Sequence, residues 1–268
     1  MTAVPPKPDY YAPERARVFQ EETVARHYPL RPPHPEGLFA ALAALVVDEP
    51  RIILDVGTGT GELARGLLPA ADRVDAIDVS LAMIEVGRAR ERGDDPRLRW
   101  IHGRAEEAPL DPPYALVTAG DSLHWMDWDV MVPRIADVLS RNGSLAIASR
   151  DWGTGQPEER EILFRHGQGP SFFRPPLNAV RELESRGLFA ERGRQRFPGA
   201  WRPTIDEYIG CRRSQSAIPR DPTRARACED EVRALLERLV REGRLEAEGE
   251  RLALTVDAWL AWGVPATP

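Results

Sequence analysis

Five short aliphatic stretches recur between residues 51 and 150, and segments of helical composition separate them. Within each stretch the apolar residues run nearly continuously, which is typical of strands covered on both faces of a parallel sheet. Because parallel strands need crossover connections, this alternation predicts a doubly wound α/β fold with its ligand at the carboxyl ends of the strands. The predicted strands are residues 51–57, 73–80, 98–103, 114–120 and 143–150, and the predicted helices are residues 36–48, 62–68, 81–93 and 128–140.

The alternation ends at residue 150, where glycine- and proline-rich segments begin. We predict that the remaining chain completes a mostly parallel, seven-stranded Rossmann-like sheet and adds an inserted helical cover. Its helices are expected at residues 177–187, 204–216 and 229–249, and its strands at 194–201 and 251–263. The predicted organisation is an N-terminal lid segment (1–35), a ligand-binding core (36–150), an acceptor-binding cover with late sheet elements (151–250), and a final strand with its tail (251–268).

Composition excludes several classes of partner. The chain has 268 residues and a net charge of −6, whereas a nucleic-acid partner normally requires a basic surface. The longest apolar run, Leu38 to Val47, is half the length of a membrane span, and the first residues show no signal-peptide core. We therefore expect a cytoplasmic protein that acts on neither nucleic acid nor membrane. Nothing in the pattern predicts an oligomeric state.

Some catalytic chemistries are excluded by residue usage. Cys211 and Cys228 have no histidine near them in the sequence, so they predict neither a zinc cage nor a disulfide framework. Of the 36 basic residues only Lys7 is a lysine, which excludes a lysine Schiff base and the lysine of a P-loop. No metal site is expected.

A glycine-rich loop, "GTGTG", follows the first predicted strand. The dinucleotide fingerprint needs G-x-G-x-x-G and an open helix N-terminus, but this loop reads G-x-G-x-G and Glu62 begins the next helix. A carboxylate there repels phosphate, and Asp55 adds a second negative charge, so the loop favours a ligand with an ammonium or sulfonium group. Asp78, 17 residues after Gly61, is spaced to accept hydrogen bonds from ribose hydroxyls. Together these features indicate an adenosine without phosphate.

The motifs "LDVGTGTG", "AIDVS", "GRAEEAPL" and "LVTAGDSLHWMD" resemble, in order, those of the class I S-adenosylmethionine-dependent methyltransferases. The resemblance covers residues 36–150, and "SLHWMD" and "SQS" are similar to small-molecule members such as the trans-aconitate methyltransferase-like group. It implies S-adenosyl-L-methionine as cofactor, S-adenosyl-L-homocysteine as product and a small-molecule substrate.

The resemblance also assigns cofactor-binding residues. It places Asp55 at the methionine end, Asp78 on the ribose hydroxyls, and the lid segment over the cofactor with Tyr28 or Arg31 at its carboxylate. Where the family often has an acidic residue that reads adenine, this chain has Arg104, which cannot accept that hydrogen bond. The remaining assignments are Gly57, Thr58, Gly59 and Gly61 in the loop, Val79, Met83, Ala105 and Glu106 at the adenine, and Ala119 on the fourth strand.

Candidate acceptor residues follow the fourth strand and lie in the cover. His124 is placed to take a proton from a hydroxyl or amine, or else packs beside Trp125 as a structural residue. Trp125, Trp128 and Trp152 either wall an apolar pocket or belong to the core. Arg213, or its neighbour Arg212, is suited to position a carboxylate acceptor.

The predicted function is methyl transfer from S-adenosylmethionine to a small molecule, at a hydroxyl or carboxylate oxygen. A protein of this fold that binds the cofactor for a non-methylating reaction is an alternative, and a nicotinamide-dependent oxidoreductase is a third. The glycine spacing and Glu62 disfavour the third class.

Overall fold

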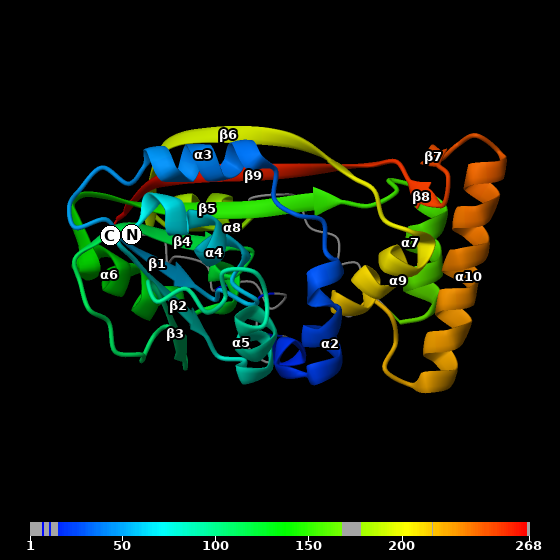
Figure 1. Cartoon of the computed structure of the whole chain (residues 1–268), viewed down its shortest axis with the longest axis horizontal. Coiled ribbons are helices and arrows are strands. Elements are labelled where there is room, and N and C mark those ends of the chain that lie inside the picture. The colour runs from blue at the N-terminus through cyan, green and yellow to red at the C-terminus, as the bar shows by residue number, and fades with distance from the viewer. Residues whose placement is uncertain (1–6, 8–10, 12–15, 168–177, 216, 267–268) are drawn as a thin grey trace.

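The computed structural model describes residues 7, 11, 16–167, 178–215 and 217–266. In these ranges the centre of the molecule is one seven-stranded sheet with the order β3-β2-β1-β4-β5-β9-β6 (Figure 1). β9 alone runs in the direction opposite to the other six strands, which confirms the predicted mostly parallel Rossmann-like sheet. The strands are β1 (Ile52–Val56), β2 (Arg73–Asp78), β3 (Leu98–His102), β4 (Tyr114–Gly120), β5 (Leu139–Trp152), β6 (Phe189–Trp201) and β9 (Leu254–Pro265).

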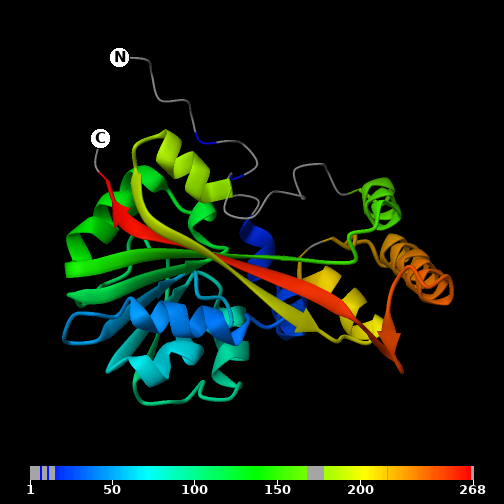
Figure 2. The ribbon, with the colours of Figure 1, turned by 90° about the horizontal axis from the view of Figure 1, so that it is seen from above.

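The later strands differ from their predicted bounds. β5 begins at Leu139 rather than residue 143, and β6 begins at Phe189 rather than 194. β6 is an edge strand, and most of its side chains are exposed or half-buried, so the apolar alternation that marks a strand is missing from "ERGRQR". β6 pairs with β9 along its whole length, and Figure 2 shows this twisted pair running from the sheet out to the cover.

Helices cover both faces of the sheet. On one face α3 and α4 bury leucines such as Leu38 and Leu63 against the strands, and on the other α6 and α8 bury Met131 and Val180 (Figure 2). These helices are α3 (Glu36–Ala44), α4 (Glu62–Leu67), α5 (Leu81–Arg88), α6 (Trp128–Val138) and α8 (Asn178–Ser185). Each is shorter than predicted, because sequence periodicity locates helix ends poorly.

The cover consists of α7 (Pro157–Arg165), α9 (Ile205–Ser214), α10 (Pro222–Arg241) and a small hairpin of β7 (Ala247–Glu248) and β8 (Arg251–Leu252). Helix α7 was not predicted, and the predicted helix at 229–249 was wrong at both ends. α10 begins earlier because Asp221 caps it by accepting the Arg224 N–H, and proline is tolerated in the first turn. It ends before Gly243, whose φ of +67° does not suit a right-handed helix.

The N-terminal segment joins the core to the cover. Its described elements are η2 (Arg17–Gln20), α2 (Glu22–His27) and η3 (Tyr28–Leu30). In Figure 1, α2 lies between α5 and α9, and its Val24 and Ala25 pack against Met83 of α5. The predicted lid segment therefore contacts both parts of the molecule, although residues 1–6, 8–10 and 12–15 lie outside the described ranges. No helix in those ranges is long and apolar enough to cross a membrane.

Candidate active site

The glycine loop after β1 is held in a left-handed conformation. Gly57, Gly59 and Gly61 have φ values of +65°, +57° and +71°, which side-chain-bearing residues rarely adopt. A Cβ on Gly57 would lie 2.5 Å from Ser122 Cβ, and one on Gly61 would lie 2.4 Å from the Trp100 ring. At Gly59 the nearest atoms belong to Tyr28, 3.6 Å away. Packing thus requires the outer two glycines, whereas Gly59 presents bare backbone toward Tyr28.

Asp78 at the end of β2 contacts this loop directly. Its Oδ2 accepts the Gly59 N–H at 2.7 Å, and its Oδ1 accepts the Ser80 N–H at 2.8 Å. Each carboxylate oxygen can accept a further hydrogen bond, so both stay available to a pair of hydroxyls. Burial raises the pKa of Asp78, while the two backbone N–H groups act in the opposite direction. The loop backbone and Asp78, the two features expected to hold a ribose, are therefore in direct contact, as their spacing along the chain predicts.

Asp55 is buried beneath the loop. Its Oδ2 accepts the Thr58 hydroxyl at 2.5 Å, and its Oδ1 accepts the Thr118 hydroxyl at 2.7 Å. Burial raises the pKa of Asp55 to about 6 despite these two hydrogen bonds. Asp55 lines the pocket described next, but both of its oxygens already serve to fix the loop to β4.

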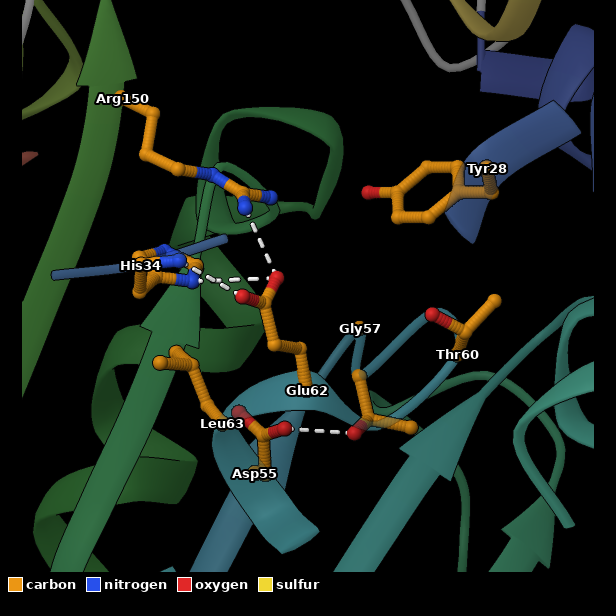
Figure 3. A pocket seen from close by; sticks show the side chains of 10 residues that line it. Tyr28, His34, Asp55, Gly57, Thr60, Glu62, Leu63 and Arg150 are labelled. Atoms are coloured by element: carbon orange, nitrogen blue, oxygen red, sulfur yellow. Dashed lines mark hydrogen bonds and ion pairs between the residues drawn. The ribbon is translucent and has the colours of Figure 1, made fainter. Parts of the chain in front are cut away.

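A pocket with about 300 Å³ of open space lies over the loop (Figure 3). Sequence reasoning missed two of its ionisable residues, His34 and Arg150, although Arg150 lies near the carboxyl end of β5 where ligands of this fold bind. The pocket is lined by Tyr28, His34, Asp55, Gly57, Thr58, Thr60, Glu62, Leu63, Gly120 and Arg150.

Glu62 is the centre of a charged group in this pocket. Its Oε2 accepts a hydrogen bond from Arg150 Nη1 at 2.8 Å, and its Oε1 accepts the His34 backbone N–H at 2.7 Å. Burial alone would raise the pKa of Glu62, but the charge of Arg150 and the hydrogen bonds from His34 lower it well below its usual range. Burial lowers the pKa of His34, so the paired charges are those of Glu62 and Arg150. The negative charge expected from the sequence at Glu62 is thus compensated by an arginine.

The two candidates from the lid segment have different positions. Tyr28 lines the pocket beside Gly59. Arg31 does not line it: its Nε donates to Ser214 Oγ at 2.9 Å and its Nη2 to the Ser214 carbonyl at 2.7 Å. Its guanidinium also lies 3.9 Å from the centroid of the Tyr28 ring. Arg31 therefore links η3 to α9, and its guanidinium packs against the Tyr28 ring.

The residues assigned to adenine follow β2 and β3. Val79 is 43% exposed, whereas Met83 and Ala105 are buried. Glu106 Oε1 accepts the Asp127 N–H at 3.0 Å and an N–H of Arg104 at 3.3 Å, so it holds the turn before α6. Ala119 is fully buried within β4.

The acceptor candidates form two separate groups. His124 and Trp125 lie in η5 (Leu123–Trp125), where the His124 ring is 4.8 Å from the Tyr11 ring and 4.6 Å from the Trp125 ring. Trp128 is 3% exposed and donates its Nε1–H to the Leu123 carbonyl at 2.8 Å, as a core residue does. None of these three lines the pocket over the loop.

The second group lies in the cover. The Trp152 ring packs edge-on against Trp201 with 5.2 Å between centroids, and Arg213 forms an ion pair with Glu229. Its neighbour Arg212 is buried and forms an ion pair with Glu159, with 2.8 Å between the charged atoms.

That buried ion pair belongs to a larger polar cluster. The Tyr208 hydroxyl lies 2.8 Å from both oxygens of Glu159, and Thr154 Oγ1 donates to the same carboxylate at 2.6 Å. The Arg212 guanidinium lies 4.7 Å from the Trp152 ring centroid. The cluster links β5, α7 and α9 inside the cover.

Comparison with known proteins finds similarity to methyltransferases. Residues 53–143 match the family described as a methyltransferase domain. The chain is 33% identical over 109 residues to a malonyl-[acyl-carrier protein] O-methyltransferase of Halalkalibacterium halodurans, an alignment that covers 38% of this chain and 40% of the relative. It is 25% identical over 164 residues to a probable S-adenosylmethionine-dependent methyltransferase of Saccharomyces cerevisiae, covering 58% and 55% of the two chains. The chain thus spans about half the length of the curated relatives it matches.

Solved structures resemble the chain over most of its length. A putative type II methyltransferase from Anaeromyxobacter dehalogenans matches with a TM-score of 0.62 and 23% identity, covering 87% of this chain and 97% of that one. A methyltransferase from Thiobacillus denitrificans in complex with S-adenosyl-L-homocysteine matches with a TM-score of 0.50 and 18% identity, covering 91% and 97%. These likenesses show the same fold. Residues 53–143 are therefore a methyltransferase domain, and the strand order and the glycine loop with its partner Asp78 are those expected of the class I S-adenosylmethionine-dependent fold.

Proposed function

We propose that this protein transfers the methyl group of S-adenosylmethionine to an oxygen atom of a small molecule. The observation that carries the proposal is the bare backbone at Gly59 hydrogen-bonded to Asp78, because this arrangement suits a ribose without phosphate. The malonyl-[acyl-carrier protein] O-methyltransferase similarity supports oxygen as the methylated atom. The motifs similar to small-molecule methyltransferases support an acceptor of low molecular mass.

The chain's own residues have mainly a positioning role in this reaction. The bound cofactor supplies an electrophilic methyl carbon next to a positively charged sulfur. The loop from Gly57 to Gly61 and Asp78 hold the cofactor, while the N-terminal segment and the cover exclude water. Aligning the acceptor oxygen with the carbon–sulfur bond accounts for most of the expected rate enhancement. In this proposal His124 takes the proton when the acceptor is a hydroxyl, and a carboxylate acceptor needs no base.

Asp78→Ala is expected to weaken S-adenosylhomocysteine binding at least tenfold. The substitution removes two hydrogen bonds to the ribose, each worth about 1.5–3 kcal/mol before solvent compensation, and frees the Gly59 N–H. Calorimetry measures the affinity, and circular dichroism checks that the sheet is retained. Unchanged binding would remove Asp78 from the ribose site.

The proposed reaction is tested with isotope-labelled methyl groups. Purified protein is incubated with labelled S-adenosylmethionine and a panel of small hydroxyl and carboxyl compounds, and product mass is recorded. Methylated oxygen is the expected result. Cofactor binding without transfer to any acceptor would favour a non-methylating protein of this fold.

His124→Ala separates the two acceptor types. With a hydroxyl acceptor we expect turnover to fall by about 10²–10⁴, with S-adenosylmethionine affinity nearly unchanged. The wild-type rate should also fall at low pH as the imidazole becomes protonated. Near-normal turnover of the variant at saturating acceptor would contradict the base role and point to a carboxyl methyltransferase.

A further inference from the structure

We propose that Arg150 and Glu62, together with the Tyr28 hydroxyl, form a two-charge site for the α-amino-acid end of the cofactor. The inference rests on the proposed function, because it assumes that an adenosine-linked amino acid occupies the pocket. It assigns the carboxylate of that end to Arg150 and the ammonium group to Glu62. The site would make the protein select S-adenosylmethionine and S-adenosylhomocysteine over adenosyl thioethers that lack the amino-acid end.

Arg150 has an unused donor in the pocket. Its side chain is only 6% exposed, and Nη1 donates to Glu62 and to the Pro32 carbonyl. Within the described ranges Nη2 donates to no protein atom, and Figure 3 shows the guanidinium and the Tyr28 hydroxyl pointing toward each other across the pocket. A buried guanidinium with a free N–H facing a hydroxyl is suited to bind a carboxylate oxygen between them.

Glu62 supplies the complementary charge. Its side chain is 29% exposed on the pocket side, and its lowered pKa keeps it ionised at neutral pH. The pair of Glu62 and Arg150 has no net charge, so an ion of either sign alone would meet one attractive and one repulsive partner. A zwitterion with its ammonium toward Glu62 and its carboxylate toward Arg150 meets two attractive partners.

Asp55, the residue first assigned to the methionine end, is less suited to this role. Asp55 is only 1% exposed and lies beneath the loop, whereas the Glu62 side chain is 29% exposed. Asp78 does not line this pocket, but Glu62 directly follows the loop whose Gly59 N–H donates to Asp78, so a ligand with its ribose at Asp78 reaches the charge pair by extending across the loop.

The test compares two ligands by calorimetry. S-adenosylhomocysteine carries the amino-acid end, and 5′-methylthioadenosine has the same adenosine and thioether without it. Wild-type protein should bind S-adenosylhomocysteine at least tenfold more tightly. Arg150→Gln should lower that affinity by about tenfold to a hundredfold and change 5′-methylthioadenosine binding less than twofold. Arg196→Gln is the matched control, since Arg196 is also paired with a carboxylate, that of Asp257, but does not line the pocket, and it should leave the ratio of the two affinities unchanged.

Several outcomes overturn the inference. Equal losses for both ligands in Arg150→Gln would mean that Arg150 acts only through the fold, and a changed ratio in Arg196→Gln would mean that the ratio does not report on contacts in the pocket. If Arg150→Gln does not fold, Tyr28→Phe keeps the ring and removes only the hydroxyl. We expect it to lower S-adenosylhomocysteine affinity several-fold and spare 5′-methylthioadenosine, and equal effects would contradict the site. Wild-type protein that binds neither ligand would instead overturn the proposed function.

Discussion

Gly57→Val should abolish cofactor binding and lower the free energy of unfolding by about 3 kcal/mol or more. The φ of +65° at Gly57 is a conformation that a β-branched residue strongly resists, and the new Cβ would lie 2.5 Å from Ser122 Cβ. Ser122 cannot easily retreat, because its hydroxyl donates to the Val56 carbonyl at 2.6 Å. Urea denaturation measures the stability and calorimetry measures S-adenosylhomocysteine binding.

Gly59→Ala is the control for backbone strain alone. Its φ of +57° carries a similar cost, but a methyl group there meets only Tyr28 at 3.6 Å, an ordinary contact. We expect this variant to lose about 1 kcal/mol of stability and to remain folded. If Gly57→Val were as stable as Gly59→Ala, the close approach to Ser122 would not explain why glycine is required there.

Arg212→Ala is expected to destabilise the protein by about 3–5 kcal/mol. Arg212 and Glu159 are both buried, and removing the arginine leaves an uncompensated carboxylate inside the cover. Tyr208 and Thr154 would still donate to Glu159, but neither carries a positive charge. The change is measured by chemical denaturation at neutral pH.

Arg213→Ala is a closely matched comparison on the same helix. Arg213 is 37% exposed and pairs with Glu229, so solvent screens the interaction and we expect a loss of about 1 kcal/mol or less. A loss of similar size in both variants would show that burial of the Arg212 pair does not govern stability here.

Much of the core could be predicted from the sequence. The parallel strands are buried on both faces, so their apolar runs and the glycines at the end of β1 stand out from polar surroundings. The edge strand β6 and helix α7 could not be predicted as readily. β6 is mostly exposed, and α7 follows a glycine- and proline-rich segment that does not suggest a helix.

Some residues of the candidate site could also be predicted from the sequence, and others could not. Asp78 and the loop glycines are adjacent to strand ends, so their spacing along the chain predicts their meeting in space. The pairing of His34, Glu62 and Arg150 depends on three segments that converge only in the folded protein, and no local pattern marks it. Trp128 could not be assigned from residue type alone, since an aromatic residue near candidate site residues in the sequence proved to be a buried core residue.

The cover leaves and re-enters the sheet at neighbouring positions. Trp201, the last residue of β6, is paired with Leu254, the first residue of β9, and a bridge between Thr204 and Arg251 continues the pairing outward. An insertion whose two ends already meet can change in length at a small entropic cost. The length of residues 202–253 can therefore vary without separating β6 from β9, so the sheet pairing does not depend on how long this insertion is.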